Sequence, residues 1–132
     1  MYHELRGKAT VIEEYGDIPR IRGYPSELNQ AFMSLLRNAV QAIEQQGTIT
    51  IATHVDKTQV YMKISDTGKG IPPDDLPRIF DPGFTTHNVG THKGLGLSIV
   101  YNIVQKHHGE IKVDSEVGKG TEFTIALPIE HP

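Results

Sequence analysis

The alternating run that ends at residue 66 constrains this chain more than any other stretch. Val60, Met62 and Ile64 recur at every second position, the spacing that places side chains on one face of a β-strand. The same parity directs Asp66 toward that apolar face, directly before the turn-forming sequence Thr-Gly-Lys-Gly-Ile. A buried carboxylate without donors costs on the order of several kcal/mol. Asp66 therefore requires hydrogen-bond donors.

Two interpretations of Asp66 follow from the residues alone. In the first, the carboxylate caps the turn after the strand, as Asp often does before Gly. In the second, it accepts a hydrogen bond from a ligand, for example from the exocyclic amine of a purine. The segment by itself does not choose between them.

Composition excludes several classes of function. The 132 residues suit one domain with its own core. The net charge of −3, without a basic cluster, argues against binding nucleic acid or an anionic membrane. Without cysteine there is no disulfide and no thiol nucleophile. The lack of a run of about 18 apolar residues predicts a cytoplasmic domain and leaves open whether a larger parent protein is membrane-anchored.

Hydrophobic periodicity predicts the fold class. The predicted helices span 26–45, 72–80 and 94–108, and the predicted strands span 8–15, 20–22, 48–54, 59–65, 110–114 and 120–127. The first of these strands is predicted to lie at a sheet edge. The pattern indicates an α+β fold, a two-layer α/β sandwich in which helices pack on one face of a mixed, mostly antiparallel sheet.

A second glycine-rich segment, 93–100 (Lys-Gly-Leu-Gly-Leu-Ser-Ile-Val), opens the last predicted helix. It lacks the third glycine of a dinucleotide fingerprint, and no strand directly precedes it. A P-loop around Gly118 fails as well, because Gly120 stands where Ser or Thr is needed. What remains is a glycine pair at a helix N-terminus, a favourable seat for phosphates.

The long loop over 81–93 is predicted to be functional, since loops of this length are uncommon in compact domains. It contains His87 and His92, but a zinc site fails for want of further ligands.

Together these segments resemble the ATP-binding catalytic domain of sensor histidine kinases. The resemblance rests on an Asn-bearing helix, Asp-Thr-Gly-Lys-Gly-Ile at 66–71, Phe-Asp-Pro-Gly-Phe-Thr-Thr at 80–86 and the segment 93–100, in that order. It covers about residues 8–128 and implies the Bergerat-type fold shared with DNA gyrase, Hsp90 and MutL.

The resemblance implies ATP and Mg²⁺ as cofactors. It assigns Asn38 to Mg²⁺ and the phosphates, and Asp66 to the adenine amino group. Residues 85–93 become a lid that orders over ATP. The implied nucleotide-binding residues are Asn38, Asp66, Gly68, Gly70, Ile71, Phe80, Phe84, Thr91, Lys93, Gly94, Leu95, Gly96 and Leu97. Further candidates for phosphate contacts, each more readily explained as a solvated surface charge, are Arg37, Lys69, His87 and His92.

The chain departs from the family pattern at four positions. Ser34 stands where histidine kinases often carry Asn and gyrase-type ATPases carry the water-activating Glu, so fast ATP hydrolysis is not expected. Gly83 replaces a usual Phe and His87 a usual Lys, which predicts altered lid contacts. Tyr24 replaces a common Asp without expected chemical consequence.

The segment 3–6 (His-Glu-Leu-Arg) looks like the start of a phosphoacceptor motif. The next residues are Gly-Lys instead of the family's Thr-Pro or Asn-Pro, and no long helix is predicted around it. We therefore expect residues 1–132 to be a single catalytic domain, a fragment of a larger kinase whose acceptor histidine lies elsewhere.

The predicted function is transfer of the γ-phosphate of Mg-ATP to a histidine on a separate dimerisation domain, in two-component signalling. The predicted partners are that phosphoacceptor domain and a downstream response regulator, and the isolated domain is expected to be monomeric. The alternatives are a serine kinase or ATPase of the same fold, and a nucleotide-sensing interaction module without transfer.

Overall fold

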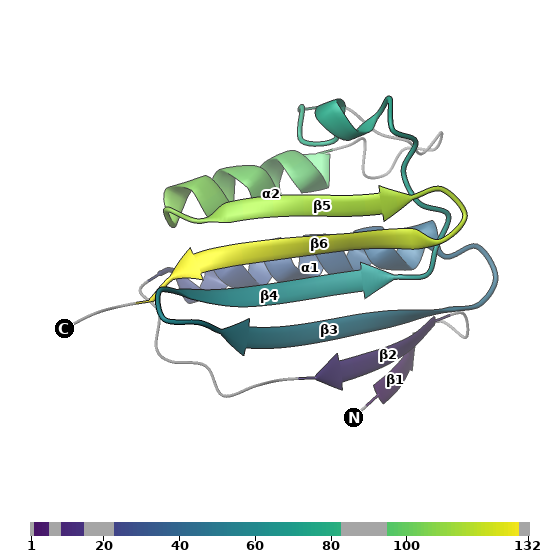
Figure 1. The fold of residues 1–132 in the computed structure, drawn as a ribbon, viewed down its shortest axis with the longest axis horizontal. Helices are drawn as coiled ribbons and strands as arrows, with labels where there is room; N and C mark the ends of the chain where they lie inside the picture. The colour runs from purple at the N-terminus through teal and green to yellow at the C-terminus, as the bar shows by residue number, and fades with distance from the viewer. Residues whose placement is uncertain (1, 6–8, 15–22, 83–94, 130–132) are drawn as a thin grey trace.

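The structure is a computed structural model that describes residues 2–5, 9–14, 23–82 and 95–129 (Figure 1). The strands are β1 (Tyr2–Leu5), β2 (Ala9–Glu14), β3 (Gly47–Val55), β4 (Gln59–Asp66), β5 (Glu110–Glu116) and β6 (Gly120–Pro128). The helices are α1 (Pro25–Ala42), the short 3-10 helix η1 (Leu76–Arg78) and α2 (Leu95–Lys106).

The strands form one sheet in the order β1-β2-β3-β4-β6-β5. Only β2 and β3 pair in parallel; the other neighbours within the described sheet are antiparallel. Figure 1 shows α1 behind β4 and β6, with α2 alongside β5, so the helices form a second layer on one face. The predicted α+β two-layer sandwich is confirmed.

The core lies between the sheet and the two helices, where each element contributes residues at its own period. Alternate residues of β3, β4 and β6 face side chains spaced three or four apart on α1 and α2. The largest fully buried side chains are Phe123, Leu35, Ile43, Ile49, Ile64, Val100 and Val104.

Three predictions about the elements were wrong. The helix predicted over 72–80 is only the 3-10 helix η1, because the prolines of this segment supply no backbone N–H for an α-helix. The short strand predicted at 20–22 lies outside the described residues. The strand predicted at the edge, 8–15, is β2, and β1 pairs outside it. Helix α1 ends at Ala42 instead of residue 45, because Ile43 adopts an extended backbone and its side chain is buried in the core. The carbonyl of Ala42 accepts a hydrogen bond from Lys69 N–H at 3.0 Å, so a tertiary contact replaces the next helical one.

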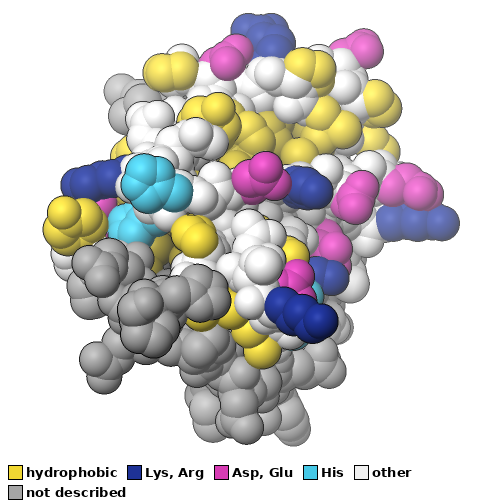
Figure 2. Space-filling view, turned by 60° about the vertical axis from the view of Figure 1, so that its left-hand side comes forward, with side chains coloured by type: hydrophobic (Ala, Val, Ile, Leu, Met, Phe, Trp, Pro, Cys, Tyr) yellow, Lys and Arg dark blue, Asp and Glu magenta, His cyan; other side chains and the backbone are white. Residues whose placement is uncertain are grey.

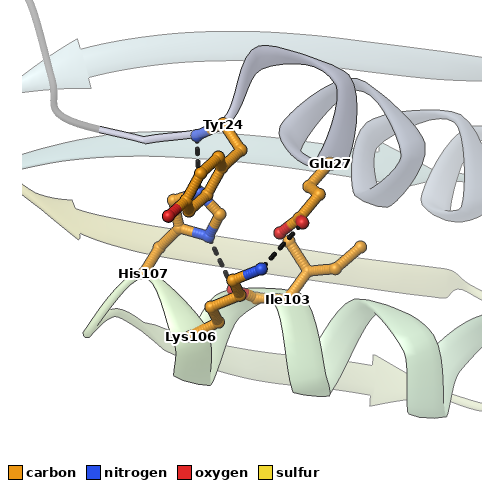
Figure 3. A network of polar contacts seen from close by, with 5 residues as sticks. All are labelled: Tyr24, Glu27, Ile103, Lys106 and His107. Carbon is orange, nitrogen blue, oxygen red and sulfur yellow. Dashed lines mark hydrogen bonds and ion pairs between the residues drawn. The ribbon is translucent and has the colours of Figure 1, made fainter.

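A polar network joins the start of α1 to the end of α2 (Figure 3). The buried ring of His107 has Nδ1 2.8 Å from the carbonyl of Ile103, and its Nε2 accepts from Tyr24 N–H at 3.0 Å. Lys106 lies over the Tyr24 ring and pairs with Glu27 at 2.9 Å. The network fixes the two helices against each other at the end away from Asp66.

The surface carries mixed charges. Figure 2 shows acidic and basic side chains interspersed on the visible face, with no broad area of one sign among the described residues. Among the described helices, none is long and apolar enough to cross a membrane.

Candidate functional site

Asp66 lies at the end of β4 and is 6% exposed. Its Oδ1 accepts from Gly68 N–H at 2.8 Å, and the carboxylate also accepts from the backbone N–H of Thr121 on β6. Burial raises the pKa of Asp66, and these two hydrogen bonds oppose the rise. The structure thus supplies the donors that the sequence required.

These contacts bear on both interpretations of Asp66. The bond to Gly68 N–H is the turn cap of the first interpretation, which is confirmed. A carboxylate has about four acceptor positions, so two N–H bonds leave capacity for a ligand donor. The second interpretation therefore remains a prediction, compatible with the first.

The loop after Asp66 is held by three neighbouring segments. Lys69 N–H donates to the end of α1, and Lys69 carbonyl accepts from Gly118 N–H in the β5–β6 turn at 2.9 Å. On the third side, Thr48 N–H donates to Thr67 Oγ1 at 2.9 Å, and Thr67 N–H donates back to the Thr48 carbonyl. These bonds fix the loop backbone without any contribution from a ligand.

Two glycines of the loop are required by packing. A Cβ on Gly68 would lie 2.5 Å from the carbonyl oxygen of Ala42. Gly70 has φ of 77°, and a Cβ there would lie 2.3 Å from the carbonyl oxygen of Glu116. Close backbone approach therefore explains both residues independently of a nucleotide. The next residue, Ile71, is buried.

Asn38 lies at the same end of the molecule as this loop. It precedes Ala42 by four residues on α1, about 6 Å along the helix axis. Asn38 is half-buried, and its side chain forms no hydrogen bond within the described part of the chain. Its neighbour Arg37 is exposed and donates to Oγ of the buried Ser34 at 3.3 Å.

Helix α2 and the segment before it form another part of the candidate site. Phe80, just after η1, is half-buried and lies 5.6 Å from Tyr101 of α2 and 6.4 Å from Phe123 of β6, between ring centroids. The backbone of α2 begins at Leu95, and Leu97 packs on the core. Phe80 thus contacts α2 and the sheet.

Several predicted site residues lie outside the described ranges. They are Gly83, Phe84, His87, Thr91, His92, Lys93 and Gly94. The structure therefore leaves the predicted lid and its phosphate contacts as predictions. Within the described residues, no group of three or more His, Cys, Asp or Glu side chains is placed to hold a metal ion.

Two residues next to Asp66 were missed by the sequence analysis. Thr121 is buried and pairs with Asp66 across β4 and β6. Ser115 on β5 contacts Thr121, with 2.8 Å between the two hydroxyl oxygens. The alternation of Thr121 with Phe123 was the available signal, because it places the threonine on the inner face.

An open cleft of about 440 Å³ lies beside these residues. Its lining is Ser65, Asp66, Asp114, Ser115, Glu116, Lys119, Gly120, Thr121 and Glu122. Four carboxylates against one lysine disfavour phosphates there. Asn38 is not part of this lining, whereas Asp66 is.

Comparison with known proteins identifies the family. Residues 23–131 match the model of the histidine kinase-, DNA gyrase B- and HSP90-like ATPases. The chain belongs to this family. Its membership confirms the resemblance to the catalytic domain of sensor histidine kinases, and it implies that the nucleotide is ATP.

Similar curated proteins include sensor histidine kinases and sporulation kinases. Sensor histidine kinase ZraS of Escherichia coli K12 is 45% identical over 112 residues, which are 85% of this chain and 24% of ZraS. Sporulation kinase E of Bacillus subtilis is 41% identical over 116 residues, 87% of this chain and 15% of the relative. The chain thus spans a quarter or less of these relatives.

Solved structures give the same result. The catalytic domain of histidine kinase ThkA matches with a TM-score of 0.79 at 28% identity, over 91% of this chain and 80% of that one. The mycobacterial sensor histidine kinase MprB matches with a TM-score of 0.78 at 29% identity, over 89% and 83%.

Proposed function

We propose that this domain binds Mg-ATP beside the end of α1 and presents the γ-phosphate to a histidine on a separate dimerisation domain. The observation that carries the proposal is the backbone contact between Lys69 and Ala42, which brings the Asp66 loop to the end of the helix that bears Asn38. In a chain of this ATPase family, that proximity supports one site in which Asp66 would accept from adenine and Asn38 would bind the metal.

Each proposed role matches the chemistry of its residue. The Asp66 carboxylate accepts from the adenine amino group, for which it has acceptor capacity. The Asn38 amide oxygen is a hard ligand suited to Mg²⁺, which neutralises phosphate charge during transfer. The segment that contains Gly94 and Gly96 precedes and opens α2 in the sequence, and the N-terminus of a helix suits phosphates. The side chains mainly position the nucleotide.

Ser34 favours transfer over hydrolysis. Its hydroxyl is buried and bonded to Arg37, and a hydroxyl does not act as a general base for water at neutral pH. The partners we propose are the dimerisation domain that carries the acceptor histidine and, after it, a response regulator. We propose that the parent kinase works in the cytoplasm.

A transfer assay in trans tests the proposal. The domain is incubated with Mg-ATP and a purified histidine-bearing dimerisation domain, and acid-labile phosphoprotein is measured. Asn38→Ala is expected to reduce transfer at least tenfold, whereas Asn29→Ala, an exposed asparagine at the other end of α1, leaves it unchanged. Tight ATP binding without transfer would instead support a nucleotide-sensing module. Acid-stable product would support a serine kinase.

A further inference from the structure

Ser115 connects the two segments that hold Asp66. Its Oγ accepts from Ile71 N–H at 2.8 Å, at the end of the glycine loop. The same Oγ lies 3.0 Å from the carbonyl of Gly120, to which it donates, and 2.8 Å from Thr121 Oγ1. A hydroxyl has one donor and two acceptor positions, so these three contacts use its full capacity, with Thr121 donating to Ser115.

The segments joined by Ser115 carry the N–H groups that orient Asp66. Gly68 N–H and Thr121 N–H both donate to the Asp66 carboxylate. Gly68 lies on the loop that ends at Ile71, and Thr121 is the partner of Asp66 in the sheet. Ser115 thus contacts Thr121 itself, and it contacts Ile71, three residues after Gly68 on the same loop. Within the described residues, no hydrogen bond joins Ser115 to Asp66 directly.

We propose that Ser115 is a positioning residue that sets selectivity for adenine by holding the Asp66 carboxylate in the direction of the base amino group. The inference rests on the proposed function, in which Asp66 accepts from adenine. The physical reason is that hydrogen bonds weaken steeply with angle, so a small rotation of a carboxylate affects the bond to an amine more than it affects stacking or phosphate contacts.

A purely structural role of Ser115 makes a different prediction. If the hydroxyl only stabilised the β5–β6 turn, its removal would weaken every nucleotide alike. If it orients Asp66, its removal weakens only ligands that carry the amino group. Purine riboside triphosphate, which lacks that group and is otherwise like ATP, separates the two cases.

The experiment is calorimetric titration of the whole chain with Mg-ATP and with Mg-purine riboside triphosphate. The unaltered chain is expected to bind ATP at least tenfold more tightly than purine riboside triphosphate, as a hydrogen bond to a charged group implies. The ratio of these two affinities is the quantity compared between variants. Ser115→Ala is expected to reduce that ratio to about two or less, mostly through weaker ATP binding. Ser115→Thr, which keeps the hydroxyl, is expected to restore it.

Ser65→Ala is the matched control. Ser65 precedes Asp66 on β4, and its hydroxyl donates to Glu122 at 3.0 Å on the opposite face of the sheet. This variant is expected to keep the full ratio. If Ser115→Ala does not fold, Thr121→Val serves instead, because it removes the hydroxyl partner and keeps the backbone N–H.

The outcomes separate this inference from the function on which it rests. A ratio of one in the unaltered chain with tight ATP binding would overturn adenine recognition by Asp66, and the inference with it. The absence of ATP binding would overturn the proposed function and the inference together. A full ratio in the unaltered chain that persists in Ser115→Ala, or in Thr121→Val, would overturn the positioning role alone.

Discussion

At the scale of single residues, the carboxylate of Asp66 has a structural role and is also proposed to bind a ligand. Asp66 caps its own turn through Gly68 N–H, pairs with Thr121 N–H and still keeps acceptor capacity. Burial makes its ionised form costly, which raises its pKa. The ionised carboxylate therefore lowers the stability of the fold. A role in binding a nucleotide would explain why a carboxylate stands at this position.

Asp66→Asn is expected to stabilise the domain while weakening ATP binding at least tenfold. A carboxyl whose pKa is raised on folding contributes stability that is fully present below its unfolded pKa of 3.8 and is lost as pH rises through the folded value. The Asn variant does not lose this stability, so its advantage in urea unfolding should grow as pH rises above 3.8 and level off above the folded pKa of Asp66. An advantage that is constant with pH would show that the carboxylate is not the cause.

Asp56 makes the opposite prediction in the β3–β4 turn. The N–H of Thr58, the Tyr61 hydroxyl and the N–H of Gln59 lower its pKa to about 2. Its stabilising effect is therefore present above pH 3.8 and lost as pH falls through about 2. Carbon NMR of the carboxyl group should give a midpoint near 2, and Tyr61→Phe should move it upward. A midpoint near 3.8 would mean that these bonds do not persist in solution.

At the scale of elements, the site depends on loops held by neighbouring backbones. The glycine loop contacts the end of α1 and the β5–β6 turn, and its glycines allow the approach. Gly70 and Gly118 both have positive φ, of 77° and 85°. Only Gly70 is crowded: a Cβ on Gly118 would meet nothing within 4 Å. Comparing substitutions at Gly70 and Gly118 therefore separates the cost of positive φ from the cost of crowding a side chain into the structure.

Gly70→Ala is expected to cost about 2–4 kcal/mol of unfolding free energy, from positive φ plus overpacking against Glu116. Gly118→Ala is expected to cost about 1 kcal/mol, from positive φ alone. ATP binding should weaken only in the first variant, because it displaces the loop next to Asp66. Equal costs in urea unfolding would contradict the role of packing.

At the scale of the whole molecule, α1 and α2 are joined far from the candidate site. His107 accepts from Tyr24 N–H and contacts the Ile103 carbonyl, and Gly23 packs against its ring (Figure 3). Lys106 and Glu27 add an exposed ion pair. The buried ring thus determines how the start of one helix meets the end of the other.

His107→Ala is expected to cost about 2–4 kcal/mol, because it leaves a cavity and an unpaired Tyr24 N–H. Lys106→Ala should cost clearly less, since exposed ion pairs contribute little. Urea unfolding of both variants tests this. Similar losses would mean that the ion pair, and not the buried ring, joins the helices.

Sequence reasoning went furthest where periodicity alone decides. The alternation of Val60, Met62 and Ile64 predicted the strand, its buried face and the inward direction of Asp66. It failed at the edge of the sheet and at the end of α1. Pairing partners and tertiary hydrogen bonds decide those positions, and neither leaves a local pattern.

The sequence by itself therefore determined the two-layer fold, the core residues and the family, because these depend on side-chain periods and on motifs read along the chain. Only the tertiary structure decided what surrounds Asp66. Thr121 and Ser115 lie about fifty residues away along the chain and reach the carboxylate only through the pairing of β4 with β6 and of β6 with β5. Long-range pairing brings together donors that no local spacing predicts.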